Sequence, residues 1–258
     1  MNQWEKGILY LTIGLTVLVL GKLWSSGLYR IYRLLFAYLL ADLFSSVAGV
    51  AVPYNTRAYV YTYFSIQTIK IVAGAFVLME IYSLALERHR ALARFGRNTV
   101  GYILAVAAVI PLVQLSRDYV ASTQTYKVLP SFFLFEQTID GTMATFLILI
   151  TIFMAWFPVR LRRNVIVYIT GFIVWWLSRA AVIHIVNKWV NNKSITEVAS
   201  VLQMCIGLGC LTYWLLGFQR EGESRTAVVG HLWDRSEAER LTAQLDAINN
   251  SLERLRRR

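Results

Sequence analysis

The chain has 258 residues, of which 57% are hydrophobic and only 16% are charged, and its mean hydropathy is +0.50. This composition excludes an ordinary soluble globular protein, in which about 25% of residues are charged. The formal net charge of +11 is also typical of nucleic-acid-binding proteins, but here the basic residues gather in short connections between apolar segments, so we expect no nucleic acid as a partner.

Seven apolar segments each approach the ~20 residues that a helix needs to cross a bilayer. They lie near residues 7–24, 32–52, 60–86, 99–116, 131–157, 165–186 and 197–218. The sequence therefore predicts an all-α membrane protein in which residues 1–218 form a seven-transmembrane helix bundle. The first segment lacks a basic start and a small-residue cleavage pattern, so we interpret it as a retained helix and not as a signal peptide.

The basic residues predict the orientation of the bundle. They concentrate in the connections after the first, third and fifth segments and in the eight arginines of residues 219–258. All of these lie on one side if the chain crosses the membrane seven times. The positive-inside rule then places the N-terminus outside and the C-terminus in the cytoplasm. At that face the basic residues would also contact anionic membrane lipids.

The first three segments differ in the polar groups that they carry. In the first, Gly7, Gly14 and Gly21 share one face, which we interpret as a packing surface within the chain, with a subunit contact as the alternative. The second carries Asp42 on a small, polar stripe. The third carries Lys70 in its outer half and Glu80 nearer the inner end, about 15 Å apart along an ideal helix, so each needs a partner elsewhere.

The fifth and sixth segments supply the remaining intramembrane charges. Glu136 and Asp140 lie one turn apart on one helix face, and Arg179 lies at the depth expected for Lys70 and Asp140. Such charges are rare in spans and persist where they are paired, hydrated or used. The cluster is either a ligand or ion site or a set of interhelical ion pairs. The candidate ligand- or ion-binding residues are Lys70, Glu80, Asp140, Arg179, Asp42 and Glu136.

The tail, residues 219–258, contains a predicted helix near 232–257. Apolar residues follow one another at alternating spacings of three and four, which is typical of a coiled-coil seam: Ala238, Leu241, Leu245, Ile248, Leu252 and Leu255. The seam can join copies of the chain in a homo-oligomer, receive a cytoplasmic signalling partner, or lie on the inner leaflet as an amphipathic helix.

Two large seven-helix families were compared with the chain. Leu39 to Leu43 and the triplet at 87–89 resemble helix 2 and helix 3 motifs of G-protein-coupled receptors, but the proline motif of their seventh helix is missing. Microbial rhodopsins carry a retinal-binding lysine in helix 7, where this chain has none. The predicted topology, short loops, basic inner face and helical extension are instead similar to the seven-transmembrane sensor modules of some bacterial signalling proteins.

This resemblance implies a multi-pass sensor or receptor-like protein of the cell membrane, which we place in a bacterial inner membrane. An anionic or zwitterionic ligand would bind near Lys70, Asp140 and Arg179, while Asp42 and Glu80 would couple the site to the inner face and the tail. The alternative is an ion channel or proton-coupled transporter, in which the same charges form a relay. No nucleophile-base pair, metal constellation or phosphate loop occurs in the sequence, so we expect no enzyme, no metal site and no cofactor.

Overall fold

The computed structural model describes residues 3–51, 57–87, 89–121, 129–156, 160–189, 192–228 and 235–257, and this part of the chain is almost entirely helical. The elements in chain order are α1 (Gln3–Ser25), η1 (Leu28–Arg30), α2 (Arg33–Ala51), α3 (Arg57–Ala85), α4 (Arg90–Ala121), α5 (Leu129–Trp156), β1 (Arg160–Arg162), α6 (Arg163–Lys188), α7 (Lys193–Gly217), η3 (Arg220–Glu223), β2 (Thr226–Val228) and α8 (Arg235–Arg257).

Six helices within the described ranges are long and apolar enough to cross a membrane: Lys6–Ser25, Arg33–Ala51, Tyr61–Ala85, Phe132–Trp156, Arg163–Lys188 and Ser194–Gly217. They confirm the prediction of a helical membrane-embedded protein. The seventh predicted segment, 99–116, lies within α4, where many side chains fall outside the described set. The seventh crossing, and the orientation that depends on it, stay predictions.

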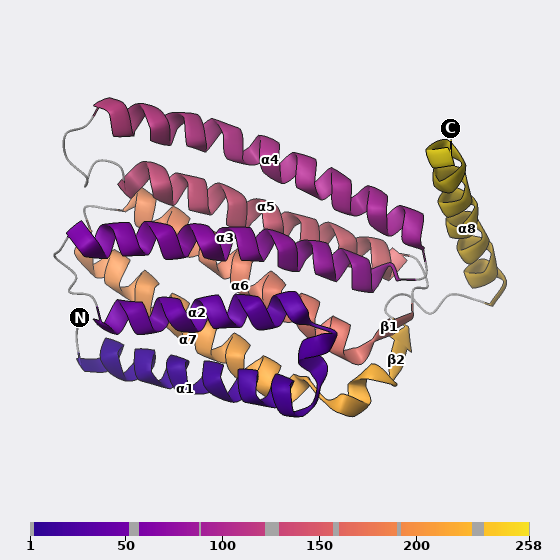
Figure 1. Ribbon diagram of the computed structural model, residues 1–258, viewed down its shortest axis with the longest axis horizontal. Helices are drawn as coiled ribbons and strands as arrows, with labels where there is room; N and C mark the ends of the chain where they lie inside the picture. Colours follow the sequence, from indigo (N-terminus) through magenta and orange to yellow (C-terminus); the bar gives the residue numbers. More distant parts are fainter. Residues whose placement is uncertain are drawn as a thin grey trace.

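Helices α1 to α7 lie side by side along the long axis of the molecule (Figure 1). Each contacts the next in sequence, and α7 returns to α1, so the helices form a closed ring. Besides its neighbours in the ring, α3 also contacts α5 and α6. Polar side chains of four helices can therefore meet inside the bundle.

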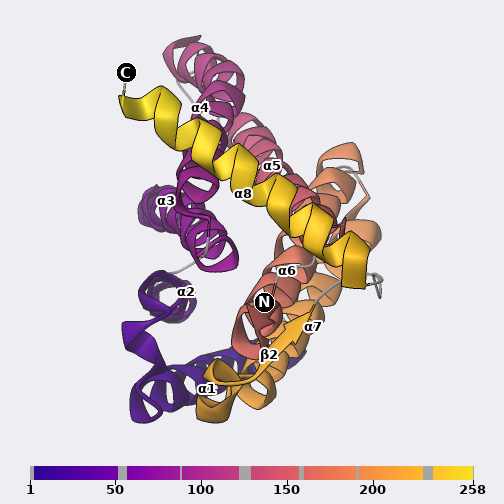
Figure 2. The same cartoon turned by 90° about the vertical axis from the view of Figure 1, so that its right-hand side faces the viewer.

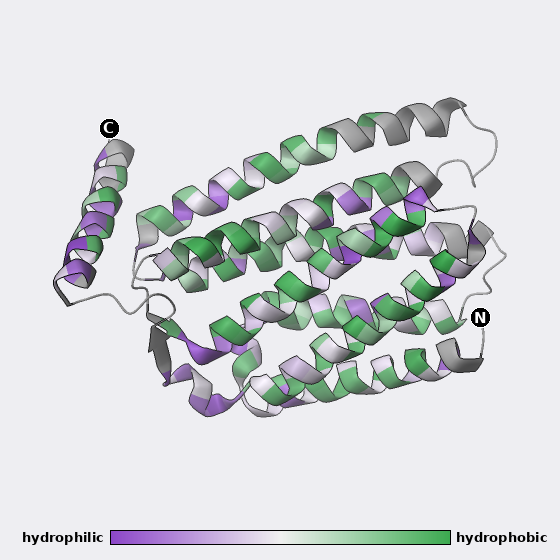
Figure 3. Cartoon of the chain, turned by 180° about the vertical axis from the view of Figure 1, so that it is seen from behind, coloured by the Kyte–Doolittle hydropathy of each residue, from purple (hydrophilic) through white to green (hydrophobic). Residues whose placement is uncertain are grey.

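Two short strands mark one end of the bundle, which we call the strand end. β1 and β2 pair antiparallel, with Arg160 opposite Val228 and Arg162 opposite Thr226. Hydrophilic residues gather here and on α8, whereas hydrophobic residues dominate the helices of the bundle (Figure 3). The pairing ties the start of the tail to the connection before α6, an arrangement that apolar patterning does not predict.

Glycine allows α6 and α7 to approach closely. A Cβ atom at Gly171 would collide with the ring of Trp214, and one at Gly217 would lie 2.6 Å from Val167. Small residues at such contacts are the usual means by which membrane helices gain packing area. The predicted packing of the first helix within the chain through its glycines is wrong, because among the described residues a Cβ at Gly7, Gly14 or Gly21 would meet nothing within 4 Å; the alternative, a subunit contact, stays a prediction.

The tail helix α8 lies across the strand end and contacts α4 (Figure 2). Leu245 is buried, and Oδ1 of Asn249 accepts hydrogen bonds from the backbone N–H groups of Ala91 and Leu92 at 3.0 and 3.4 Å. Asn249 therefore caps the first turn of α4 from a distant part of the chain. The predicted seam is partly occupied by this contact, and the coiled coil itself stays a prediction.

Candidate functional site

The buried charge cluster consists of Asp42, Lys70, Glu136, Asp140 and Arg179, contributed by α2, α3, α5 and α6. Nζ of Lys70 lies 2.6 Å from Oδ1 of Asp42, and both side chains are about nine-tenths buried. The charge of Lys70 also acts on Asp140, so the five residues form one electrostatic neighbourhood. The sequence predicts that Asp42, with Glu80, couples the site to the inner face, whereas in the structure Asp42 is the direct partner of Lys70.

Arg179 bridges the two carboxylates of α5. Its Nε lies 2.6 Å from Oδ2 of Asp140, and its Nη2 contacts Oε1 of Glu136. The carboxylates are four residues apart, so they project from one face of the helix. The planar guanidinium presents several donors in a fixed fork, which suits it to two acceptors at once. The contact is consistent with the prediction that Asp140 and Arg179 lie at the same depth in the membrane.

Glu136 has two further donors on α3. The side-chain amide of Gln67 donates to Oε1, and the hydroxyl of Tyr63 donates to Oε2 at 3.3 Å. Gln67 lies one turn before Lys70, and Tyr63 one turn before Gln67, so these side chains share one face of the helix. Tyr63 was missed in the sequence, although this spacing of four from Gln67 was the signal that places it there.

The cluster contains three carboxylates and two cations. Glu136, Asp140, Asp42 and Lys70 are 1%, 3%, 7% and 8% exposed. If all five groups are ionised, the cluster carries one net negative charge away from water. Isolated buried charges cost several kcal/mol, so such a site favours the uptake of one positive charge.

A buried amide lies at the same level of the bundle. Both side-chain polar atoms of Gln203 are buried and have no hydrogen-bond partner in the part of the chain that the structure describes. Gly207 of α7 packs against the ring of Trp175, and α6 and α7 are antiparallel neighbours. On α7, Gln203 lies one turn beyond Gly207, away from the strand end. On α6, Arg179 lies one turn beyond Trp175 in the same direction, so Gln203 and Arg179 are at the same level of the bundle.

Glu80 lies outside the cluster, near the strand end. Its Oε1 accepts from the backbone N–H of Leu34 at 3.1 Å, and its Oε2 accepts from the hydroxyl of Tyr168 at 2.9 Å. A carboxylate at the start of a helix satisfies free N–H groups and interacts favourably with the helix dipole. Glu80 therefore caps α2 from α3.

A second group of polar residues, the strand-end network, surrounds Glu223. This carboxylate accepts from Tyr32 at 2.6 Å, from Asn164 at 2.7 Å and from Arg162 at 3.2 Å. Arg162 also donates to Glu87 at 2.7 Å. Burial and the hydrogen bond to Glu223 raise the pKa of the Tyr32 hydroxyl, so this group keeps its proton. The network fixes the start of the tail to three connections of the bundle.

Aromatic rings fill the space between the cluster and the strand-end network. Phe172 is fully buried, and its ring centroid lies 4.7 to 5.4 Å from those of Trp176, Trp214, Tyr38 and Tyr168. On α6, Phe172 stands between Tyr168, which contacts Glu80, and Arg179 of the cluster. The rings therefore form an apolar layer between the two polar regions.

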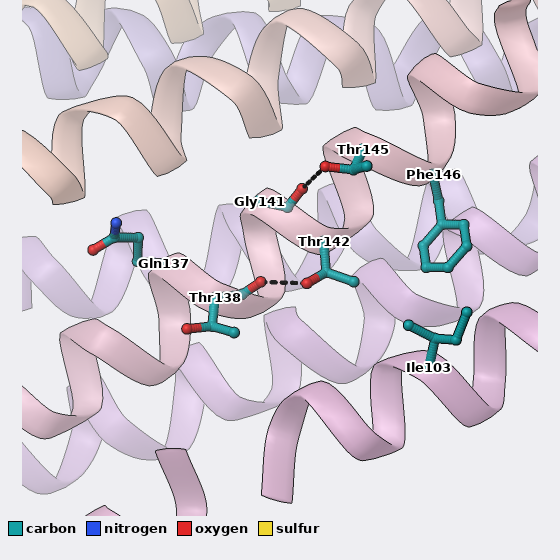
Figure 4. A pocket seen from close by; sticks show the side chains of 7 residues that line it. All are labelled: Ile103, Gln137, Thr138, Gly141, Thr142, Thr145 and Phe146. Carbon is teal, nitrogen blue, oxygen red and sulfur yellow. Dashed lines mark hydrogen bonds between the residues drawn. The ribbon is translucent and has the colours of Figure 1, made fainter. Parts of the chain in front are cut away.

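The groove in Figure 4 has a volume of about 420 Å³ and lies between α4 and α5. Its wall includes Thr138, Thr142 and Thr145, each of whose hydroxyls donates to the carbonyl one turn earlier. These threonines lie on the side of α5 opposite Glu136 and Asp140. The groove therefore does not open onto the cluster.

Within the described ranges, no three His, Cys, Asp or Glu side chains are grouped as metal ligands. No family model matches the chain, and comparison with curated proteins and with solved structures gives no match.

Proposed function

We propose that this chain is a multi-pass membrane protein that takes up and releases a proton at the buried charge cluster, as a proton-coupled transporter or channel. The observation that carries the proposal is the excess of one carboxylate over the cations in a site whose three carboxylates and Lys70 are more than nine-tenths buried. A proton neutralises this excess and needs no cavity. Of the anionic or zwitterionic ligands expected for a sensor, an anion would add to the negative charge and a zwitterion would leave it uncompensated.

Asp140 is the carboxylate that best fits the role of proton carrier. Lys70 forms an ion pair with Asp42, whereas Arg179 forms ion pairs with both Glu136 and Asp140. Glu136 also accepts from Gln67 and Tyr63, which stabilise its anionic form. With Asp140 neutral, Arg179 compensates Glu136 alone. When the proton leaves Asp140 for water, two carboxylates compete for one guanidinium.

Proton flux into liposomes tests this function. Purified protein is reconstituted with a pH-sensitive dye inside, and a pH gradient and membrane potential are applied. We expect flux in the wild type and a loss of at least tenfold in Asp140→Asn, because an amide cannot exchange the proton. Glu221→Gln is the matched control, since Glu221 is exposed outside the bundle. Absence of flux in the wild type, or equal flux in Asp140→Asn, would contradict transport.

A second candidate function is a sensor whose protonation is transmitted to the tail. It is favoured by the contact of α8 with α4 through Asn249 and by the contact of Oδ1 of Asp246 with Nδ1 of His89 at 3.5 Å. The two functions share the protonation site and differ in whether the proton crosses the membrane. A cytoplasmic C-terminus remains a prediction from the distribution of basic residues, and a bacterial inner membrane remains a prediction from the resemblance to bacterial sensor modules.

A further inference from the structure

A second hollow, with a volume of about 640 Å³, lies at the strand end beside the end of α1. It is enclosed by the turn after α1, by η1 and by η3. The residues that matter for its chemistry are Trp24, Gly27, Tyr29, Arg30, Arg220 and Glu223. It is separate from the buried charge cluster, so a role for it does not depend on proton transport.

The hollow lies where the apolar part of the bundle ends. The first membrane-spanning helix ends at Ser25 and the second begins at Arg33, so the segment between them falls at the boundary of the hydrocarbon. Trp24 is 61% exposed and stacks on Tyr29, with ring centroids 4.7 Å apart. Exposed aromatic side chains at this depth are typical of the headgroup region of a bilayer.

Two arginines give the hollow a positive charge. Arg30 and Arg220 are both exposed and line it. Nε of Arg30 donates to the hydroxyl of Tyr29 at 3.1 Å, and its guanidinium lies 5.7 Å from the centre of that ring. These contacts hold one guanidinium in place at the rim. Arginine suits phosphate recognition because its planar fork donates two parallel hydrogen bonds.

The lining carboxylate does not cancel this charge. Both oxygens of Glu223 are engaged inside the strand-end network, one by Tyr32 and Asn164 and the other by Arg162. Gly27 has a φ of 74°, a left-handed conformation that glycine adopts without strain, and it turns the chain between α1 and η1. The turn brings Trp24 and Arg30 to the same hollow.

We propose that this hollow binds the phosphate-bearing headgroup of an anionic phospholipid. The arginines would contact the phosphate, and the exposed ring of Trp24 would lie beside the glycerol and the upper acyl chain. Basic pockets between membrane helices on the cytoplasmic side are known to hold anionic headgroups. The predicted orientation places the strand end in the cytoplasmic leaflet, where anionic lipids are found.

Native mass spectrometry of the detergent-purified protein tests the site. Phosphatidylglycerol or phosphatidylcholine is titrated, and bound lipid is counted on the wild type, on Arg30→Ala/Arg220→Ala and on Arg94→Ala/Arg97→Ala. The last pair is the control, since both arginines are exposed near the same end of the bundle but do not line the hollow. We expect the first double variant to bind phosphatidylglycerol about thirty-fold more weakly, because each arginine contributes about 1 kcal/mol at a membrane surface.

The control pair should bind phosphatidylglycerol as the wild type does, and the wild type should prefer it to phosphatidylcholine. Equal losses in the two double variants would show general attraction to a basic face and overturn the site. Displacement of the lipid by millimolar inorganic phosphate would assign the hollow to a free anion instead. Arg30→Lys/Arg220→Lys should retain part of the binding, and circular dichroism verifies that each variant remains folded.

Discussion

At the scale of single residues, each intramembrane charge has a partner, and the partners differ in kind. Lys70 has a carboxylate, Arg179 has two carboxylates, and Glu80 accepts from a backbone N–H of α2 and from a tyrosine hydroxyl of α6. Glu80 thus has a structural role that accounts for its position without a relay. The residue that is left with too few donors is Asp140, and for this reason we assign the mobile proton to it.

The ion pair of Lys70 and Asp42 gives a prediction of its own. Lys70→Met leaves a buried carboxylate without its cation, and removal of one partner of a buried pair costs about 3–5 kcal/mol. Lys70→Met/Asp42→Leu removes both charges and should recover most of this loss. Chemical unfolding in detergent micelles measures the difference. If the double variant has the same free energy of unfolding as Lys70→Met, the loss of stability does not come from an unpaired carboxylate at Asp42.

At the scale of helices, close packing of α6 on α7 depends on positions where a side chain does not fit. Gly171→Ala would place a methyl group against the ring of Trp214, and overpacking of this kind typically costs about 1–3 kcal/mol. Gly209→Ala on α7 is the control, because nothing lies within 4 Å of its Cβ, and alanine is the better helix former. Thermal unfolding should show a lower midpoint for Gly171→Ala only; equal midpoints would contradict the predicted packing.

The comparison of sequence and structure is most informative at this scale. Apolar length predicted six of the spans, and helix periodicity predicted that Glu136 and Asp140 share a face. Periodicity within one helix does not say which neighbour that face meets. The regular glycines of α1 were therefore assigned to packing although they face open space, whereas Gly171, which belongs to no such repeat, packs against Trp214.

The contacts of Glu223 at the strand end could not be predicted from the sequence either. Glu223 lies in the tail, 59 residues from Asn164 and 191 from Tyr32, so no local pattern brings these residues together. The pairing of β1 with β2 depends in the same way on how the ring of helices closes. The signals available in the sequence were only the polar residues at the helix ends.

At the scale of the whole molecule, the tail is part of the folded chain. Asn249 of α8 accepts from the first N–H groups of α4, so we expect hydrogen exchange at Ala91 and Leu92 to be slow. Asn249→Ala should speed exchange there, whereas Asn250→Ala, at an exposed neighbouring position, should not. Hydrogen-exchange mass spectrometry compares the two. Equal exchange in both variants would mean that α8 does not stay on α4.

The proton on Asp140 is the central claim, and infrared difference spectroscopy during a pH titration tests it most directly. A protonated carboxylic acid has a carbonyl stretching band that a carboxylate lacks. We predict one such band in the folded wild type at about pH 6 to 7, where exposed Asp and Glu side chains are ionised. The band should disappear as the pH rises further, and it should be missing in Asp140→Asn but remain in Glu221→Gln. A wild-type spectrum without a band at this pH, or a band there that is unchanged in Asp140→Asn, would contradict a proton on Asp140.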